Sequence, residues 1–134
     1  MPNSVPDETA IVTKLSSRPV AGTVERLIGM LQEKGMTLFA VIDQSAAARQ
    51  VGLELRDTTL VIFGSPVAGT PVMKASPLSA LDLPLKVLIW SDEGHTKVSY
   101  YAPAVLASRH HLEADLALNL AGIDALTDAL VASS

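Results

Sequence analysis

Apolar residues recur along the chain at two spacings, and these spacings predict most of its elements. Val24, Leu27 and Leu31 lie three or four positions apart, which is the spacing of one face of an α-helix. Gly35 follows this run and is a residue that commonly ends helices. We therefore predict a helix over residues 20–34.

Short runs rich in β-branched and aromatic residues predict the strands. The predicted strands are 9–15, 36–42, 58–63, 85–90 and 96–101. The last two flank the tight connection Asp92-Glu93-Gly94-His95 and are predicted to form an antiparallel hairpin. Residues 36–42 carry apolar residues on both faces of the predicted strand, which indicates a central strand covered on both faces or a strand that pairs at an interface.

The remaining elements are short helices that alternate with these strands. They are predicted from Asp43 to Val51, near 69–75, near 104–110, and in a last helix that carries Leu116, Leu120, Ile123, Leu126 and Leu130. The resulting order, β-α-β-α-β-α-β-β-α-α, predicts an α+β fold: a two-layer sandwich with a mixed or mostly antiparallel sheet and helices packed on it. We expect residues 1–8 to form a loose N-terminal tail and residues 9–134 to form a single domain.

The low charge of the chain suggests a buried interface. Only 18% of its 134 residues are charged and 49% are hydrophobic, whereas about 25% charged residues is usual. A small chain with few charges has little polar surface to cover itself, and obligate interfaces resemble a core cut in half. We therefore expect a homodimer.

Charge and hydropathy also exclude several classes of partner. The net charge is −4 and no basic stripe is present, so nucleic acid is not an expected partner. No apolar run reaches the roughly 18 residues of a membrane helix. The first ten residues show neither the basic nor the apolar region of a secretory signal, so we expect no membrane partner and a cytoplasmic location.

Metal and cofactor chemistry finds little support in the sequence. The chain has no cysteine, which excludes disulfides, Cys-type zinc sites and thiol nucleophiles. In a helix, His111 and Asp115 would share one face, as would His110 and Glu113. A closed metal site would need a further ligand such as His95, so we expect no metal and no cofactor.

The segment Gly64-Ser65-Pro66-Val67-Ala68-Gly69-Thr70 follows a predicted strand and nearly matches the phosphate-loop pattern. The lysine of that pattern is absent, and Pro66 and Pro71 lack backbone donors. A triphosphatase is therefore not expected. The free N–H groups of Gly69 and Thr70 remain candidates for a small anionic ligand, and a purely structural turn is the alternative.

Asp43 follows the strand 36–42, where an acid can act as a general base or cap the next helix. If the strands 36–42 and 58–63 were parallel neighbours, their carboxyl ends would open on the same sheet edge. The predicted ligand-binding residues would then surround one cleft near the 43–45 and 64–70 loops: Asp43, Gln44, Gly64, Ser65, Gly69 and Thr70. An antiparallel pairing would separate the two loops by the length of a strand.

Three functional hypotheses remain open. The first, which we favour, is a non-enzymatic homodimeric module that binds a small ligand or a partner in this cleft. The second is a small enzyme with Asp43 as general base and Ser65 or a tyrosine hydroxyl as donor, which requires a pocket and a raised pKa of Asp43. The third is a structural interaction subunit with an apolar interface and no pocket.

A family resemblance covers most of the chain. Residues 34–90 and 98–112 contain, in order, the blocks F-A-V-I-D, G-L-x-L, T-T-L-x-I-F-G-x-P, G-T-P and L-D-L-P-L-K. This order resembles the domain-of-unknown-function 302 family, and the resemblance implies a small dimeric α+β domain with no established activity, cofactor or catalytic residue. The matching positions include Asp43, Gly64, Pro66, Gly69, Thr70, Leu83 and Pro84.

Two positions depart from the pattern of that family. Gln44 stands where the family commonly has His, and Ser65 stands where it commonly has Asn in F-G-N-P. Any proton chemistry that used an imidazole beside the acid would therefore be in doubt in this chain.

Overall fold

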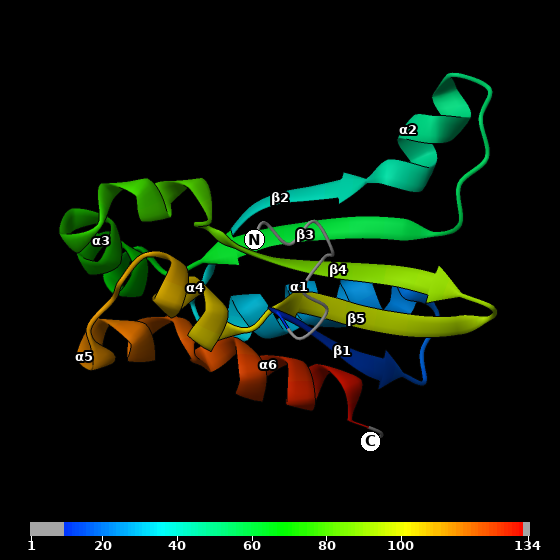
Figure 1. The fold of residues 1–134 in the computed structure, drawn as a ribbon. Coiled ribbons are helices and arrows are strands. Elements are labelled where there is room, and N and C mark those ends of the chain that lie inside the picture. Colours follow the sequence, from blue (N-terminus) through cyan, green and yellow to red (C-terminus); the bar gives the residue numbers. More distant parts are fainter. Residues whose placement is uncertain (1–9, 133–134) are drawn as a thin grey trace, which may run out of the picture.

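A computed structural model describes residues 10–132, so the tail predicted at 1–8 lies outside the described residues. The strands are β1 (Ile11–Ser16), β2 (Thr37–Asp43), β3 (Thr58–Gly64), β4 (Leu85–Asp92) and β5 (His95–Tyr101). They form one sheet in the order β1-β5-β4-β3-β2, and each neighbouring pair is antiparallel. This arrangement confirms the predicted α+β class with an antiparallel sheet (Figure 1).

Helices pack on one face of the sheet and gather at its two ends (Figure 1). The helices α1 (Val20–Glu33) and α6 (Gly122–Val131) lie against one face, and α2 (Gln44–Gln50) projects beyond β2. The opposite end carries the short elements α3 (Pro66–Ala75), η2 (Pro77–Leu81), α4 (Pro103–Arg109), α5 (Ala114–Ala117) and η3 (Leu118–Leu120).

The core forms where the apolar face of α1 meets alternate residues of the central strands. Burial along β3 alternates strictly, as expected when successive side chains point to opposite faces. Val61 of β3 pairs with Val87 of β4, and both are fully buried against Leu27 and Leu31 of α1. Leu130 of α6 completes this cluster.

The predicted hairpin is confirmed. Asp92 pairs with His95, so Glu93 and Gly94 form a two-residue turn. Their φ angles are +50° and +83°, and positive φ at both central positions matches the twist of antiparallel strands. Glycine meets this requirement without a steric cost.

Two sequence expectations need correction. The strand 36–42 is not central, because β2 lies at the sheet edge and most of its residues are exposed; pairing at an interface stays a prediction. The predicted last helix is broken between α5, η3 and α6. Its first part packs Leu120 against Val72 and Leu106, whereas α6 packs against the sheet, and the break lets the two parts serve two separate clusters.

Candidate functional site

The two loops expected to share a cleft lie at opposite ends of the sheet. In the antiparallel pair of β2 and β3, Asp43 faces Thr59 and Thr37 faces Gly64. Figure 1 accordingly shows α2 and α3 at opposite ends. The predicted shared cleft is therefore wrong, because the antiparallel register of β2 and β3 places the end of β2 beside the start of β3.

Asp43 caps α2. Its Oδ1 accepts hydrogen bonds from the Ser45 hydroxyl at 2.7 Å and from the Ala46 amide at 2.9 Å. These two bonds hold the pKa of Asp43 below its usual value, which is the opposite of the raised pKa that the general-base hypothesis requires. The Ser45 hydroxyl also accepts from the amide of Thr58 at 3.2 Å, so the cap ties α2 to β3.

The 64–70 segment begins α3 earlier than the predicted 69–75. Ser65 is the N-cap, and its Oγ accepts from the Ala68 amide at 3.4 Å, while Pro66 occupies the first turn. Three segments approach closely at Gly64. A Cβ added there would lie 3.6 Å from Pro84 and 3.7 Å from Phe39.

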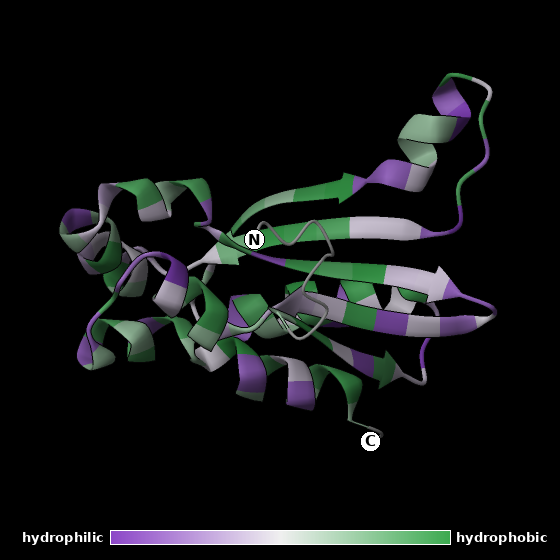
Figure 2. Ribbon diagram, viewed as in Figure 1, coloured by the Kyte–Doolittle hydropathy of each residue, from purple (hydrophilic) through white to green (hydrophobic). Residues whose placement is uncertain are grey.

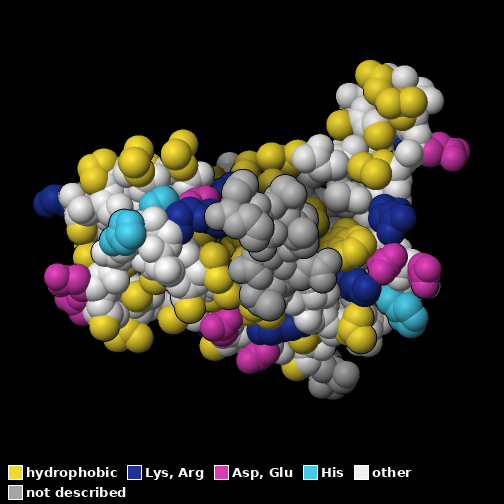
Figure 3. Space-filling view, viewed as in Figure 1, with side chains coloured by type: hydrophobic (Ala, Val, Ile, Leu, Met, Phe, Trp, Pro, Cys, Tyr) yellow, Lys and Arg dark blue, Asp and Glu magenta, His cyan; other side chains and the backbone are white. Residues whose placement is uncertain are grey.

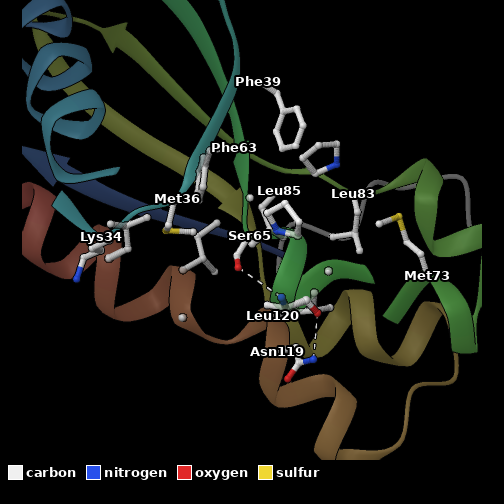
Figure 4. A pocket seen from close by; sticks show the side chains of 18 of the residues that line it. Lys34, Met36, Phe39, Phe63, Ser65, Met73, Leu83, Leu85, Asn119 and Leu120 are labelled. Atoms are coloured by element: carbon white, nitrogen blue, oxygen red, sulfur yellow. Dashed lines mark hydrogen bonds between the residues drawn. The ribbon is translucent and has the colours of Figure 1, made fainter. Parts of the chain in front are cut away.

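A cavity of about 580 Å³ opens beside this segment. Figure 4 shows its lining from the ends of β2 and β3, the first turn of α3, the segment before β4, and the η3–α6 region. Of the six predicted ligand-binding residues, Gly64, Ser65 and Gly69 line it. Asp43 and Gln44 lie at the other end of the sheet, and Thr70 lines a separate surface hollow with Lys74.

The lining is apolar with three polar side chains: Lys34, Ser65 and Asn119. Asn119 donates from Nδ2 to the carbonyl oxygen of Ala68 at 3.0 Å (Figure 4), so it holds η3 against the start of α3. Within residues 10–132, no aspartate or glutamate lines the cavity. A concave, mostly apolar space with a few placed polar groups is typical of small-molecule sites.

Sequence reasoning missed most of this lining, including Met36, Phe39, Met73 and Asn119. Phe39 sits at an irregularity in the pairing of β2 with β3 and is 53% exposed. The available signal was the apolar pattern on both faces of 36–42, which we interpreted as a central strand covered on both faces or a strand that pairs at an interface.

Tyr100 and Tyr101 are adjacent in β5 and therefore point to opposite faces of the sheet. Tyr100 is buried, and its hydroxyl donates to Asp124 Oδ1 at 2.5 Å. Burial and this bond raise the pKa of Tyr100. Tyr101 is exposed, and neither tyrosine lines the cavity.

The histidine cluster is not arranged as the helical spacing suggested. The helix α4 ends at Arg109 and α5 begins at Ala114, so His111 and Asp115 do not share a helix face. His110 Nε2 instead lies 2.6 Å from Asp82 Oδ2, which also accepts from Arg109 at 3.0 Å. Burial opposes ionisation of Asp82, but these two partners outweigh it and lower its pKa.

Comparisons with known proteins place these observations in context. The proteins named fluoride-specific ion channel FluC 1 in Brucella suis and in Brucella abortus are each 39% identical to this chain over 106 residues, or 78% of it. The chain spans only about two fifths of their length, 42% and 39% respectively. Within residues 10–132, none of the helices combines the length and apolar character required to cross a bilayer.

The fold has a solved counterpart. The crystal structure of an uncharacterized conserved DUF302 protein from Bacillus stearothermophilus matches with a TM-score of 0.77 at 20% identity, covering 91% of this chain and 95% of that one. The family model described as domain of unknown function DUF302 matches residues 12–130. The chain therefore belongs to the DUF302 family.

Proposed function

We propose that the protein is a binding module whose ligand occupies the cavity between β2, β3, α3 and α6. The observation that carries this proposal is the cavity itself, whose volume of about 580 Å³ falls within the roughly 300–1,000 Å³ typical of ligand sites. An apolar ligand gains about 25 cal/mol for each Å² of apolar surface removed from water. The apolar lining supports such a ligand.

The small anion expected at Gly69 and Thr70 is less well supported as an isolated ligand. The Gly69 amide already donates to the Ser65 carbonyl at 2.7 Å, and Thr70 lies outside the cavity lining. A fully hydrated ion would lose its water and find few polar partners. These features favour a ligand that is largely apolar.

Binding is better supported than the catalytic alternative. The enzyme hypothesis paired Asp43 with Ser65 or a tyrosine hydroxyl, and the antiparallel register keeps Asp43 and Ser65 at opposite ends of β2 and β3. The hydroxyl of Tyr100 is engaged by Asp124. A general base must lie within hydrogen-bond reach of the group that it serves, and these residues do not share one site.

The test is the binding of a neutral, environment-sensitive naphthylamine dye, measured by fluorescence. Ala125 lines the cavity from α6, whereas Ala129, one turn further along the same helix, does not. We expect the wild type to bind the dye, Ala125→Phe to weaken binding at least tenfold by placing a ring in the cavity, and Ala129→Phe to leave it unchanged. A folded Ala125→Phe variant with wild-type affinity, or a wild type that binds no dye, would contradict the proposal.

We also propose that the module is a homodimer joined through its projecting arm, which we define as residues 37–57. Figure 2 shows β2 as largely hydrophobic, and Figure 3 shows hydrophobic side chains gathered around α2. The arm carries half of the large hydrophobic side chains that are exposed in residues 10–132: Leu38, Phe39, Val41, Ile42, Val51, Leu53 and Leu55. An edge strand also offers unpaired backbone groups, and a second copy related by a two-fold axis would satisfy both.

A second candidate function follows from the Brucella relatives. The chain matches only part of proteins named fluoride-specific ion channels, so we propose as an alternative that this domain serves a fluoride channel by sensing the ion. A melting temperature that rises with sodium fluoride and not with sodium chloride would support direct sensing. Equal responses to the two salts would contradict it. A cytoplasmic location stays a prediction.

A further inference from the structure

The charges around the cavity specify the ligand class further, and this inference rests on the proposed function. We propose that the ligand is an anionic amphiphile: an unbranched apolar chain that fills the cavity and ends in a free carboxylate beside Lys34. The apolar lining accounts for the chain, and the electrostatics of the rim account for the head group.

Lys34 supplies the first electrostatic argument. Among the described residues, 10–132, Lys34 is the single charged side chain that lines the cavity. No aspartate or glutamate of this range lines it. Lys34 lies at the end of α1, is exposed, and forms no ion pair with other residues of the described range. A cation at the rim of an apolar space favours a ligand with one negative end.

The helix ends add to the field of Lys34. The first turns of α3 and α6, each a helix of ten residues, both line the cavity. Helix N-termini carry a partial positive charge, and α6 begins without a side-chain cap. Asp124, the acid in the first turn of α6, lies outside the cavity lining, and its Oδ1 accepts from the Tyr100 hydroxyl. The positive groups that line the cavity are therefore Lys34 and the start of α3.

The flexibility of the lining suits an unbranched chain. Met36 and Met73 lie on the lining with Phe39 and Leu83 (Figure 4), and thioether side chains adapt to irregular apolar shapes. At the start of α6, a Cβ added to Gly122 would meet no atom within 4 Å. Gly122 is exposed and lines the cavity without a side chain of its own.

The experiment compares two ligands that differ only in the head group. Decanoic acid and decan-1-ol are titrated at pH 8 against the neutral dye bound to the wild-type protein. We expect the acid to bind roughly three- to tenfold more tightly than the alcohol, because exposed charge pairs and helix ends each contribute modestly. Equal affinities would overturn the head-group proposal and leave the binding module intact, whereas displacement by neither compound would overturn both.

A matched pair of lysine variants locates the head group. Lys34→Gln removes the cation at the rim, and Lys74→Gln removes an exposed lysine of α3 that lines the separate hollow instead. We expect Lys34→Gln to weaken decanoate binding about two- to fivefold with no change for decanol, and Lys74→Gln to leave the acid-to-alcohol ratio as in the wild type. An unchanged ratio in Lys34→Gln, or an equal loss in Lys74→Gln, would contradict the assignment.

Discussion

At the scale of single residues, the local sequence decides what Asp43 does. Its side chain accepts bonds from Ser45 and Ala46, two and three positions further on. Such contacts depend on near neighbours alone, so capping could be predicted from the sequence. The glycines at the end of α1 and in the β4–β5 turn were predictable for the same reason, since both adopt positive φ.

The cap gives Asp43 a defined effect on stability. Because hydrogen bonds from Ser45 and Ala46 hold the pKa of Asp43 in the folded protein below its ordinary value, its carboxylate stabilises the fold above that ordinary value and loses this effect as the pH falls through the folded pKa. We expect Asp43→Ala to lower the melting temperature at pH 7. The difference from the wild type should shrink between pH 5 and pH 2 in thermal unfolding followed by circular dichroism.

Asp43→Asn is the matched control, since asparagine also caps helices and does not titrate. It should melt above Asp43→Ala at pH 7. A difference between wild type and Asp43→Ala that stays constant down to pH 2 would show that the carboxylate does not stabilise the helix.

At the scale of elements, the spacing of apolar residues predicted where strands and helices lie in the sequence. It did not predict which strands lie next to each other in the sheet. The spacing of apolar residues in β3 and α1 shows which face each element buries, and this spacing can be read from each segment alone. The position of a strand within a sheet depends on pairing with distant segments. Residues 36–42 were therefore compatible with a central strand, although β2 lies at the edge of the sheet.

The packing of α6 on the sheet gives a prediction at this scale. Leu130 is fully buried in the main core, whereas Leu118, on η3, is 72% exposed. We expect Leu130→Ala to reduce the free energy of unfolding by about 2–5 kcal/mol, and Leu118→Ala to change it by less than about 0.5 kcal/mol. Urea unfolding measures both, and similar losses in the two variants would contradict this account of the core.

At the scale of the whole molecule, the cavity unites four segments that lie far apart in sequence: residues 34–39, 63–73, 83–85 and 119–126. Gly64, Ser65 and Gly69 could be proposed from the sequence because they stand together in a loop after a strand. The other lining residues carry no motif of their own. Only the sheet order and the break between α5 and α6 bring them together, and neither was predictable from local patterns.

The projecting arm gives a second prediction for the whole molecule. Ile42 lies on the edge strand β2 and Leu15 on the opposite edge strand β1, and both are exposed. If two copies pair through β2, Ile42→Lys should shift the mass measured by light scattering from dimer to monomer, whereas Leu15→Lys should remain a dimer. A monomeric wild type, or dissociation by Leu15→Lys alone, would contradict pairing through the arm.

The central claim is that a ligand binds in the cavity between β2, β3, α3 and α6, and the position of bound ligand tests it most directly. In an ¹⁵N-labelled sample titrated with the neutral dye, glycine amides report on both ends of the sheet. The account predicts saturable shifts for Gly64, Gly69 and Gly122, which line the cavity, and none for Gly52 or Gly94. Two results would contradict the account: shifts that appear only at Gly52 and at the amides of residues 43–45, or the absence of a saturable shift at the three cavity glycines.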